Sequence, residues 1–305
     1  FCDNYKDLFA TFLSLNDINS KVLFMDLILY RLLGHSKVKI KNAENCVKKN
    51  QCIEKSTKLL NSRPSNIDLI NYDGKPLMHF EGYEIDGKQI ALELFNSRSF
   101  KSAFNRMQYF FSSDNSFNVQ AGDTVIDGGT CLGESSIAFS IAAGKGGKVF
   151  AFDPISNHCK VARQNAMQNG LYNITVIQQG LGENTNNLDI KPVETDRARP
   201  DFNLDAFKDQ ISITSIDDFV EKKNIEQIDF IKMDIEGWEL QALKGAAKTI
   251  EKHYPKLAIC LYHRFSDFVN IPQWIISRYP EYEFRIGHYT IFEDETVLYA
   301  KKRDT

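Results

Sequence analysis

The hydrophobic pattern from residue 123 onward alternates between two periods. Short apolar runs rich in β-branched and aromatic residues predict strands, and segments with apolar residues three or four positions apart predict helices. Strands that alternate with helices predict an α/β fold with a doubly wound, mostly parallel sheet covered on both faces. The seven predicted strands are residues 124–127, 148–153, 173–178, 228–234, 256–262, 281–286 and 295–300. The last two lack a long helix between them, so we expect an antiparallel hairpin at one edge of the sheet.

The residues before this alternation follow a different pattern. Residues 1–66 predict helices and end in a linker at 61–66. Residues 80–95 alternate like two strands on either side of Gly87, which predicts a hairpin. A helix over 97–111 would lead from this hairpin towards the core. The chain is therefore divided into a helical extension (1–66), a hairpin with a connecting helix (67–119) and an α/β domain (120–305).

Composition excludes several classes of protein. The 305 residues are 43% hydrophobic and 25% charged, as in an ordinary soluble globular protein. The net charge of −3 provides no basic field for nucleic acid. The most apolar stretch, residues 22–33, contains Asp26 and Arg31 and is too short to span a bilayer, so we predict no membrane span.

The six cysteines show no C-x-x-C pair and no cysteine–histidine cluster with zinc spacing. We therefore predict no metal ligands. A chain of this size does not need disulfides to be stable, so we interpret the cysteines as reduced thiols and expect a cytoplasmic protein.

A glycine-rich segment, residues 124–134, follows the first predicted strand and precedes a helix. A nicotinamide or flavin site requires G-x-G-x-x-G, but Thr130 stands where the second glycine is needed. A phosphate-binding P-loop requires a lysine where Glu134 stands, and that negative charge would repel a triphosphate. The third interpretation is a loop that binds S-adenosylmethionine (SAM).

The SAM interpretation suits the residues best. Asp127 ends the strand, and Gly128, Gly129 and Gly133 let the backbone approach the methionine part of SAM. SAM carries an ammonium and a sulfonium group, so the charge of Glu134 helps here. A tight turn that binds no ligand remains the alternative.

The second predicted strand also ends in an acid. Asp153 can accept hydrogen bonds from the two hydroxyls of a ribose, or it can serve as a helix cap or surface acid. Two strand-end acids that are one crossover apart favour a nucleoside ligand. Thr130 of the loop and Gly180, after the third predicted strand, are added to the candidate cofactor contacts.

The third acidic strand end is residues 228–239. In a doubly wound sheet this turn lies beside the glycine loop, so Asp234 would sit near the donor methyl group and the acceptor. Its carboxylate can orient the amino group of SAM, deprotonate a hydroxyl or bind a divalent cation. Glu236 can bind an acceptor hydroxyl or a cation. The alternative for both is helix capping, which we prefer for Glu239.

Two basic side chains lie near this turn. Lys232, on a central strand, must find a carboxylate partner or reach the cleft. His263 follows another central strand, where it is either a general base or an exposed loop histidine. Asp234, Glu236, His263 and Lys232 are the candidate catalytic residues.

These motifs resemble the FkbM family of SAM-dependent methyltransferases over about residues 120–300. The most specific part is the lysine-x-aspartate-x-glutamate-glycine turn, combined with a threonine-x-x-aspartate-aspartate segment upstream. The edge hairpin is also typical of methyltransferases and unlike the sheet of a dehydrogenase. The segments that carry the resemblance are residues 125–134, 150–154, 214–219, 231–237 and 295–300.

The resemblance implies a class I methyltransferase (Rossmann-like) fold and methyl transfer from SAM, mostly to a hydroxyl of a glycan or natural product. It implies that SAM binds at Asp127, Gly128, Gly129, Gly133 and Asp153, and that Asp234 and Glu236 face the reacting centre. Two departures are Asp153, where the family usually has glutamate, and Gly129-Thr130-Cys131, where it usually has glycine-alanine-asparagine.

We therefore expect a SAM-dependent O-methyltransferase that acts on a small-molecule or glycan acceptor and not on nucleic acid. The alternatives are a catalytically silent methyltransferase fold that serves as a binding module, and a dinucleotide-dependent oxidoreductase. The resemblance does not explain residues 1–119, which could cover the cleft, form a homo-oligomer or dock a carrier.

Overall fold

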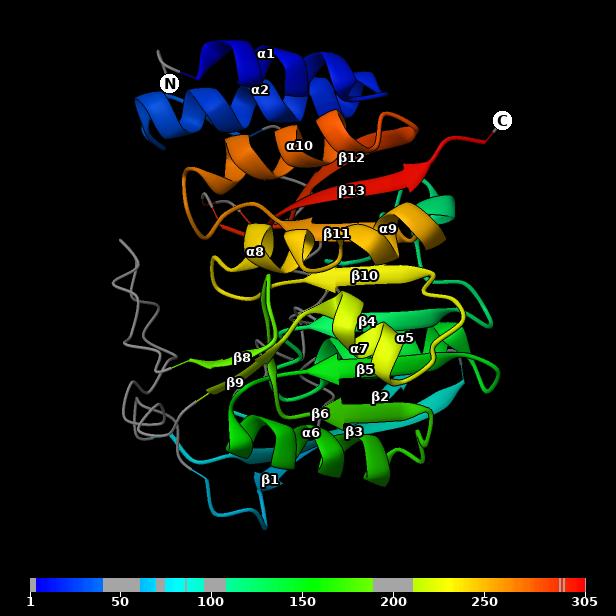
Figure 1. Ribbon diagram of the computed structural model, residues 1–305. Coiled ribbons are helices and arrows are strands. Elements are labelled where there is room, and N and C mark those ends of the chain that lie inside the picture. The colour runs from blue at the N-terminus through cyan, green and yellow to red at the C-terminus, as the bar shows by residue number, and fades with distance from the viewer. Residues whose placement is uncertain are drawn as a thin grey trace.

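The structure, a computed structural model, describes residues 4–40, 61–69, 75–85, 87–95, 108–188, 211–290, 292 and 294–304. Its centre is a seven-stranded sheet with the strand order β12-β13-β11-β10-β4-β5-β6 (Figure 1). The strands are β4 (Thr124–Gly128), β5 (Lys148–Phe152), β6 (Ile174–Ile177), β10 (Phe230–Met233), β11 (Lys256–Cys260), β12 (Tyr282–His288) and β13 (Thr296–Lys302). All seven predicted strands are confirmed.

Five neighbouring strands, from β6 to β11, run parallel to one another. Strand β13 lies between β11 and β12 and is antiparallel to both. The predicted edge hairpin of β12 and β13 is therefore confirmed. In this hairpin the later strand occupies the inner position, so β12 is the edge.

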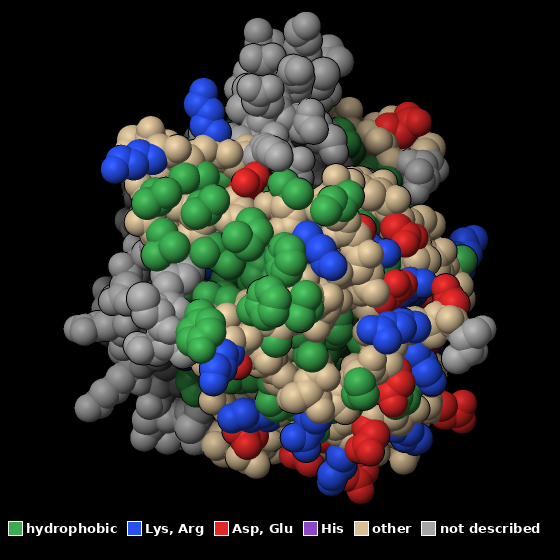
Figure 2. Space-filling model, turned by 90° about the horizontal axis from the view of Figure 1, so that it is seen from above, with side chains coloured by type: hydrophobic (Ala, Val, Ile, Leu, Met, Phe, Trp, Pro, Cys, Tyr) green, Lys and Arg blue, Asp and Glu red, His purple; other side chains and the backbone are tan. Residues whose placement is uncertain are grey.

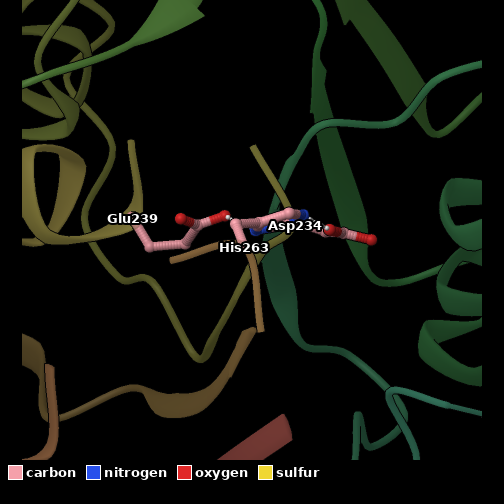
Figure 3. A group of neighbouring side chains, drawn as sticks. All are labelled: Asp234, Glu239 and His263. Carbon is pink, nitrogen blue, oxygen red and sulfur yellow. Dashed lines mark ion pairs between the residues drawn. The ribbon is translucent and has the colours of Figure 1, made fainter. Parts of the chain in front are cut away.

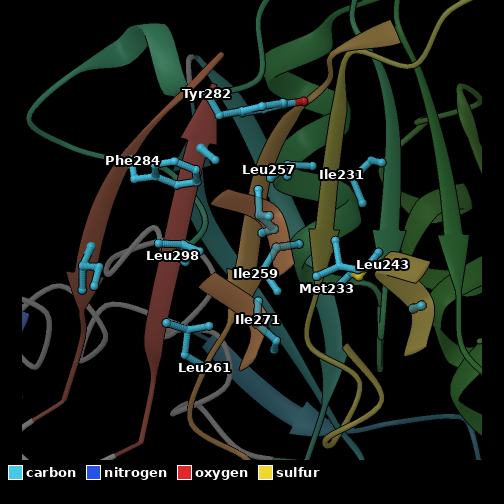
Figure 4. Close-up of a cluster of buried hydrophobic side chains, with 14 of the residues drawn as sticks. Ile231, Met233, Leu243, Leu257, Ile259, Leu261, Ile271, Tyr282, Phe284 and Leu298 are labelled. Carbon is cyan, nitrogen blue, oxygen red and sulfur yellow. The ribbon is translucent and has the colours of Figure 1, made fainter. Parts of the chain in front are cut away.

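Two hydrophobic cores lie on opposite faces of the sheet, because successive strand residues point to opposite sides. In β10, Phe230 joins one core and Ile231 joins the other. The core around Ile231 is shown in Figure 4, where Met233, Leu257 and Ile259 from adjacent strands also contribute. Helices cover both faces, as predicted: α5 (Glu134–Ala143), α6 (Ser156–Gln168), α7 (Ile216–Lys222), α8 (Glu239–Lys244), α9 (Ala247–His253) and α10 (Asp267–Arg278).

The predicted N-terminal helices are α1 (Tyr5–Ser14) and α2 (Ile18–Leu33), which lie next to α10 and β12 (Figure 1). The turn between them is tied to the sheet, since the amide of Phe284 donates to Asn16 Oδ1 at 2.7 Å. The amide of Ile286 likewise donates to Ser20 Oγ at 3.0 Å. These contacts hold the helical extension against the α/β domain.

The outer face of α1 and α2 is also apolar, and Figure 2 shows hydrophobic side chains gathered on it. A surface helix usually has polar residues on its outer face, so α2, which is apolar on two sides, is unusual. No helix of the described residues is long and apolar enough to cross a membrane. The exposed apolar residues are Tyr5, Phe9, Leu13, Ile18, Met25, Leu29, Leu32 and Leu33.

The predicted hairpin is confirmed as β2 (Met78–Ile85) and β3 (Lys88–Leu94). The linker predicted at 61–66 is wrong at its start, because β1 (Asn61–Pro64) pairs with β2 and extends this small sheet. The sheet packs on α6, where Asn165 Oδ1 accepts from the amide of Glu93 at 2.7 Å.

The remaining described segments surround the main sheet. A third small sheet contains β7 (Gly180–Leu181), β8 (Asn186–Leu188) and β9 (Ile211–Thr214). A short 3-10 helix, η1, spans Asn115–Phe117. Most of the helix predicted over 97–111 lies outside the described residues, and its last residues, 108–111, form a turn and not a helix. Most of residues 184–210, a polar stretch that the sequence predicts to be an irregular loop, also lies outside the described residues.

Candidate active site

The glycine loop after β4 is shaped by close backbone contacts. Gly129 has φ +77°, and a Cβ atom there would lie 1.9 Å from the carbonyl oxygen of Asp234. The amides of Gly129 and Thr130 donate to the carbonyl of Phe152 at 2.9 and 3.0 Å. Only glycine fits at position 129, and it brings the loop into direct contact with the turn after β10.

Asp127 lies at the base of this loop and is fully buried. Its carboxylate accepts from the hydroxyls of Ser135 and Ser136 at 2.7 and 2.5 Å. Its other oxygen forms an ion pair with Lys232 Nζ at 3.0 Å. Asp127 therefore ties the strand, the loop and the start of α5 together through groups of the protein itself.

Lys232 supports the same loop from β10. Its ammonium group donates to the carbonyls of Gly128 and Gly129 at 3.0 and 2.7 Å and lies 4.7 Å from the centre of the Tyr109 ring. Burial opposes its charge, but Asp127 and other acids nearby outweigh burial and raise the pKa of Lys232. Of the two predicted alternatives, a carboxylate partner or a position in the cleft, Lys232 therefore shows the first.

The far side of the loop leads into α5. Thr130 Oγ1 lies 2.8 Å from Ser136 Oγ. Gly133 has φ +96°, and a Cβ atom there would lie 3.1 Å from Ala162 Cα, so glycine lets α5 begin against α6. Burial raises the pKa of Glu134, the first residue of α5, to about 7. An acid in this state becomes charged readily when a cation binds beside it.

Asp153 follows β5 and joins the loop to α6. Its two oxygens accept from the amides of Cys131 and Ile155 at 3.0 and 2.9 Å. Nδ1 of His158, which sequence reasoning missed, lies 3.2 Å from the same carboxylate. Burial opposes protonation of His158, but Asp153 outweighs it and raises the pKa. The remaining cofactor candidate is Gly180 in β7. A Cβ atom added there would lie 3.8 Å from Cβ of Pro154, the residue after Asp153.

Asp234 follows β10 and accepts hydrogen bonds from two side chains and an ion pair from a third. The hydroxyls of Tyr109 and Tyr262 donate to it at 2.5 and 2.9 Å, and His263 Nε2 lies 3.1 Å from Oδ1. Burial would raise the pKa of Asp234, but His263, Lys232 and the tyrosine hydroxyl bond hold it well below its usual range. Asp234 is therefore a firmly oriented carboxylate.

The turn after Asp234 has unusual backbone angles. Glu236 has φ +56° and Gly237 has φ +91°. A non-glycine residue with positive φ is uncommon, and such strain gathers at functional sites. The Glu236 side chain is 37% exposed, while Oε2 lies 3.5 Å from His263 Nε2. Glu236 is thus the most exposed carboxylate of this cluster.

His263 lies between Asp234 and Glu239 (Figure 3). Its Nδ1 is 2.9 Å from Oε1 of Glu239, which also accepts from the amide of Ile235 at 2.8 Å. Burial lowers the pKa of His263, but Glu239 and Asp234 reverse the effect and raise it well above its usual value. An imidazolium ion between two carboxylates is better suited to holding them in place than to removing a proton.

The structure therefore gathers all four candidate catalytic residues around the contact of two loops. It also adds four residues that sequence reasoning missed or interpreted otherwise. Glu239, interpreted as a helix cap, is fully buried against His263. Tyr262 adjoins His263 in the sequence and could have been suspected, whereas Tyr109 is 125 residues from its partner and gives no local signal. His158 lies five residues after Asp153, in the first turn of α6, so its spacing gives only a weak local signal.

A parallel sheet that ends in a reversed final strand, with acids at the carboxyl ends of β4, β5 and β10, defines a class I methyltransferase fold. The model of the Methyltransferase FkbM domain matches residues 123–286, more than half of the chain. The protein therefore belongs to the FkbM methyltransferase family, whose cofactor is SAM. Family membership sets aside the oxidoreductase alternative.

Among solved structures, the chain is similar to a methyltransferase FkbM from Methylobacillus flagellatus, with 24% identity and a TM-score of 0.59. That match covers 98% of this chain and 59% of the other, so the chain spans about three fifths of that protein's length. An rRNA methylase from Streptococcus thermophilus matches at 13% identity and a TM-score of 0.43, over 66% of this chain and 97% of the other. Aeropyrum pernix fibrillarin with bound SAM matches at 13% identity and a TM-score of 0.43, over 75% of this chain and 90% of the other. No curated protein matches the sequence.

Proposed function

We propose that the protein transfers a methyl group from SAM to a hydroxyl oxygen of a sugar, glycan or natural-product acceptor. The observation that carries this proposal is the direct contact of two acidic loops at the carboxyl ends of β4 and β10. The backbone of Gly129 meets that of Asp234 so closely that no side chain fits between them. A cofactor on the first loop would therefore lie beside the acids of the second.

The residues around the glycine loop fit SAM. Glu134 and Asp153 are acids beside a loop that would receive a cationic ligand. Asp153 would hold the ribose, and the backbone of Gly128, Gly129 and Gly133 would line the methionine part, with Thr130 and Gly180 at its margins. When bound, SAM supplies an electrophilic methyl group.

The acceptor side belongs to the turn after β10. Asp234 and Glu236 would accept hydrogen bonds from the acceptor and align its hydroxyl oxygen, and alignment is the main contribution expected of such an enzyme. His263 holds Asp234 and the turn, and Lys232 holds the glycine loop. Because both ring nitrogens of His263 face carboxylates within the protein, removal of the hydroxyl proton falls to the carboxylates of the turn.

A catalytically silent binding module is the second candidate. It is favoured by one observation: Asp127, Asp153 and Asp234 each already have partners within the protein. A carboxylate has about four sites for accepted hydrogen bonds, so such partners leave room for a ligand at Asp153 and Asp234. Turnover, and not binding, separates the two candidates.

Calorimetric titration with SAM, S-adenosylhomocysteine and NAD tests the proposal. We expect both SAM and S-adenosylhomocysteine to bind and NAD not to bind. The Asp153→Ala variant should lose this affinity, while a matched Asp304→Ala variant, at a side chain that is 93% exposed, should keep it. If folded protein binds no SAM, the proposal fails. If it binds SAM but methylates no member of a glycan and polyol panel, the binding module is favoured.

A further inference from the structure

His263 Nε2 faces two carboxylates in the turn after β10. It lies 3.1 Å from Asp234 Oδ1 and 3.5 Å from Glu236 Oε2. Small divalent cations bind their ligands at about 2.0–2.2 Å, so neighbouring ligand atoms are about 3.0–3.5 Å apart. Both distances from His263 Nε2 are therefore in the range expected between two ligands of one cation.

Glu239 occupies the other side of the imidazole ring (Figure 3). It is fully buried, and its Oε1 lies 2.9 Å from His263 Nδ1. A metal-binding histidine almost always donates its second ring N–H to a carboxylate or carbonyl, which fixes the ring and its tautomer. In this arrangement the Nδ1–H group would donate to Glu239, and the cation would take the place of the proton on Nε2, opposite Asp234 and Glu236.

The burial of these groups is an independent indication. The His263 side chain is only 4% exposed, yet neither ring nitrogen makes a hydrogen bond of good geometry, although carboxylate oxygens are close. A buried polar group without a well-formed hydrogen bond needs an explanation, and a cation bound at Nε2 would provide one. The ligand atoms that Asp234, Glu239 and His263 offer all lie within 4.8 Å of one another.

We propose that Asp234, Glu236 and His263 bind one divalent cation of the Mn²⁺ or Mg²⁺ class, and that Glu239 orients His263. Two carboxylates and one imidazole suit Mn²⁺, because oxygen ligands are the majority and imidazole is tolerated. Glu236 extends from a strained, partly exposed turn, so the site opens on the side where the acceptor would bind. Cation binding was one alternative for Asp234 and Glu236 in the sequence, and the structure adds His263 and the carboxylate of Glu239 that orients it.

Binding of the cation does not depend on methyl transfer, but its role does rest on the proposed function. In the proposed function, the Asp234 carboxylate lies beside the acceptor hydroxyl. A cation held beside it would bind the acceptor oxygen and withdraw electron density from the O–H bond. The proton could then pass to a nearby carboxylate or to water as the methyl group is transferred.

Electron paramagnetic resonance with Mn²⁺ tests the site directly, because the six-line signal of free Mn²⁺ falls as the ion binds. We expect one Mn²⁺ per chain, displaced by excess Mg²⁺. Glu236→Gln should weaken binding at least 10-fold, and Glu239→Gln should weaken it about 10- to 100-fold through loss of the orienting bond. Glu183→Gln, at a side chain that is 48% exposed, is the matched control and should bind like the wild type.

The outcomes are separable from those of the proposed function. Circular dichroism shows whether each variant is folded, and the partly exposed Glu236 provides a variant that should fold even if Glu239→Gln does not. If folded protein binds no Mn²⁺, or if Glu183→Gln weakens binding as much as Glu236→Gln, the cation site is overturned. SAM binding without Mn²⁺ binding would overturn this site alone, and Mn²⁺ binding without SAM binding would overturn the proposed function alone.

Discussion

Asp127 and Asp234 end neighbouring parallel strands, β4 and β10, but they have different surroundings. Asp127 is fully buried, and its partners are one lysine and two serines. The Asp234 side chain is 20% exposed, and its partners are two tyrosines and a histidine. Both give the same signal in the sequence, an acid after an apolar strand. Their partners indicate that Asp127 builds the loop, whereas the role that we propose for Asp234 is in the chemistry.

The largest expected effect comes from the cation that balances Asp127. Lys232→Met removes that cation and leaves a buried carboxylate without compensation, which should cost about 3–5 kcal/mol of unfolding free energy. Urea unfolding measures the loss. Lys256→Met is the matched control, because Lys256 pairs with Asp123 at 2.7 Å but the two side chains are 17% and 13% exposed. Equal losses in the two variants would contradict the special role of Lys232.

The same substitution at the two acids sharpens the comparison. Asp234→Asn should lower turnover about 100-fold or more, because the carboxylate at the acceptor is lost, while the unfolding free energy changes little. Asp127→Asn should instead lower stability, because Lys232 loses its buried partner. Methyl-transfer assays and urea unfolding on both variants check this. Full activity in folded Asp234→Asn would remove Asp234 from the mechanism.

The contact between the loops can be tested at Gly129. Gly129→Ala should lower the free energy of unfolding by more than about 2 kcal/mol. The new methyl group would meet the Asp234 carbonyl, and the ordinary penalty for positive φ adds to this clash. Gly170→Ala is the control, because Gly170 has φ +62° with nothing within 4 Å of the added atom. It should cost only about 1–2 kcal/mol. Similar losses would mean that the two loops can separate freely.

The smallest expected effect is a pH dependence that arises at Glu134. Its pKa is raised from 4.5 to about 7 by burial, so between these values the native protein binds more protons than the unfolded chain. Stability contributed by this residue is therefore lost as the pH rises from about 4.5 to 7. Glu134→Gln should be more stable than the wild type at pH 8, and the difference should vanish near pH 4. Thermal unfolding at both pH values measures it.

Sequence alone predicts most of the fold, because strand and helix periods are local properties of the chain. The seven strands and the edge hairpin follow from them. The strand-end acids follow as well, since a parallel sheet gathers the carboxyl ends of its strands. The charge and hydrogen bonding of each acid depend on partners that are distant in the sequence. Tyr109 reaches Asp234 across 125 residues, and Glu239 meets His263 only through packing.

The sequence therefore identified candidate residues of the site but left their chemical roles open. His263 was proposed as a base from its position after a central strand, but its protonation depends on two carboxylates from other segments. Lys232 was expected either to pair with an acid or to reach the cleft, and only the register of β10 against β4 places it opposite Asp127. The catalytic assignments stay predictions until the variants are measured.

The position of β13 has a consequence for how the chain folds. This strand fits between β11 and β12, both of which precede it, so neither can complete its pairing until residues 296–302 are in place. The N-terminal helices depend on the same event, because Ser20 bonds to β12 across 266 residues. Contacts of such sequence separation carry a large loop-closure cost and slow the search for the native state. In kinetic terms, closing this edge of the sheet should be a late step of folding.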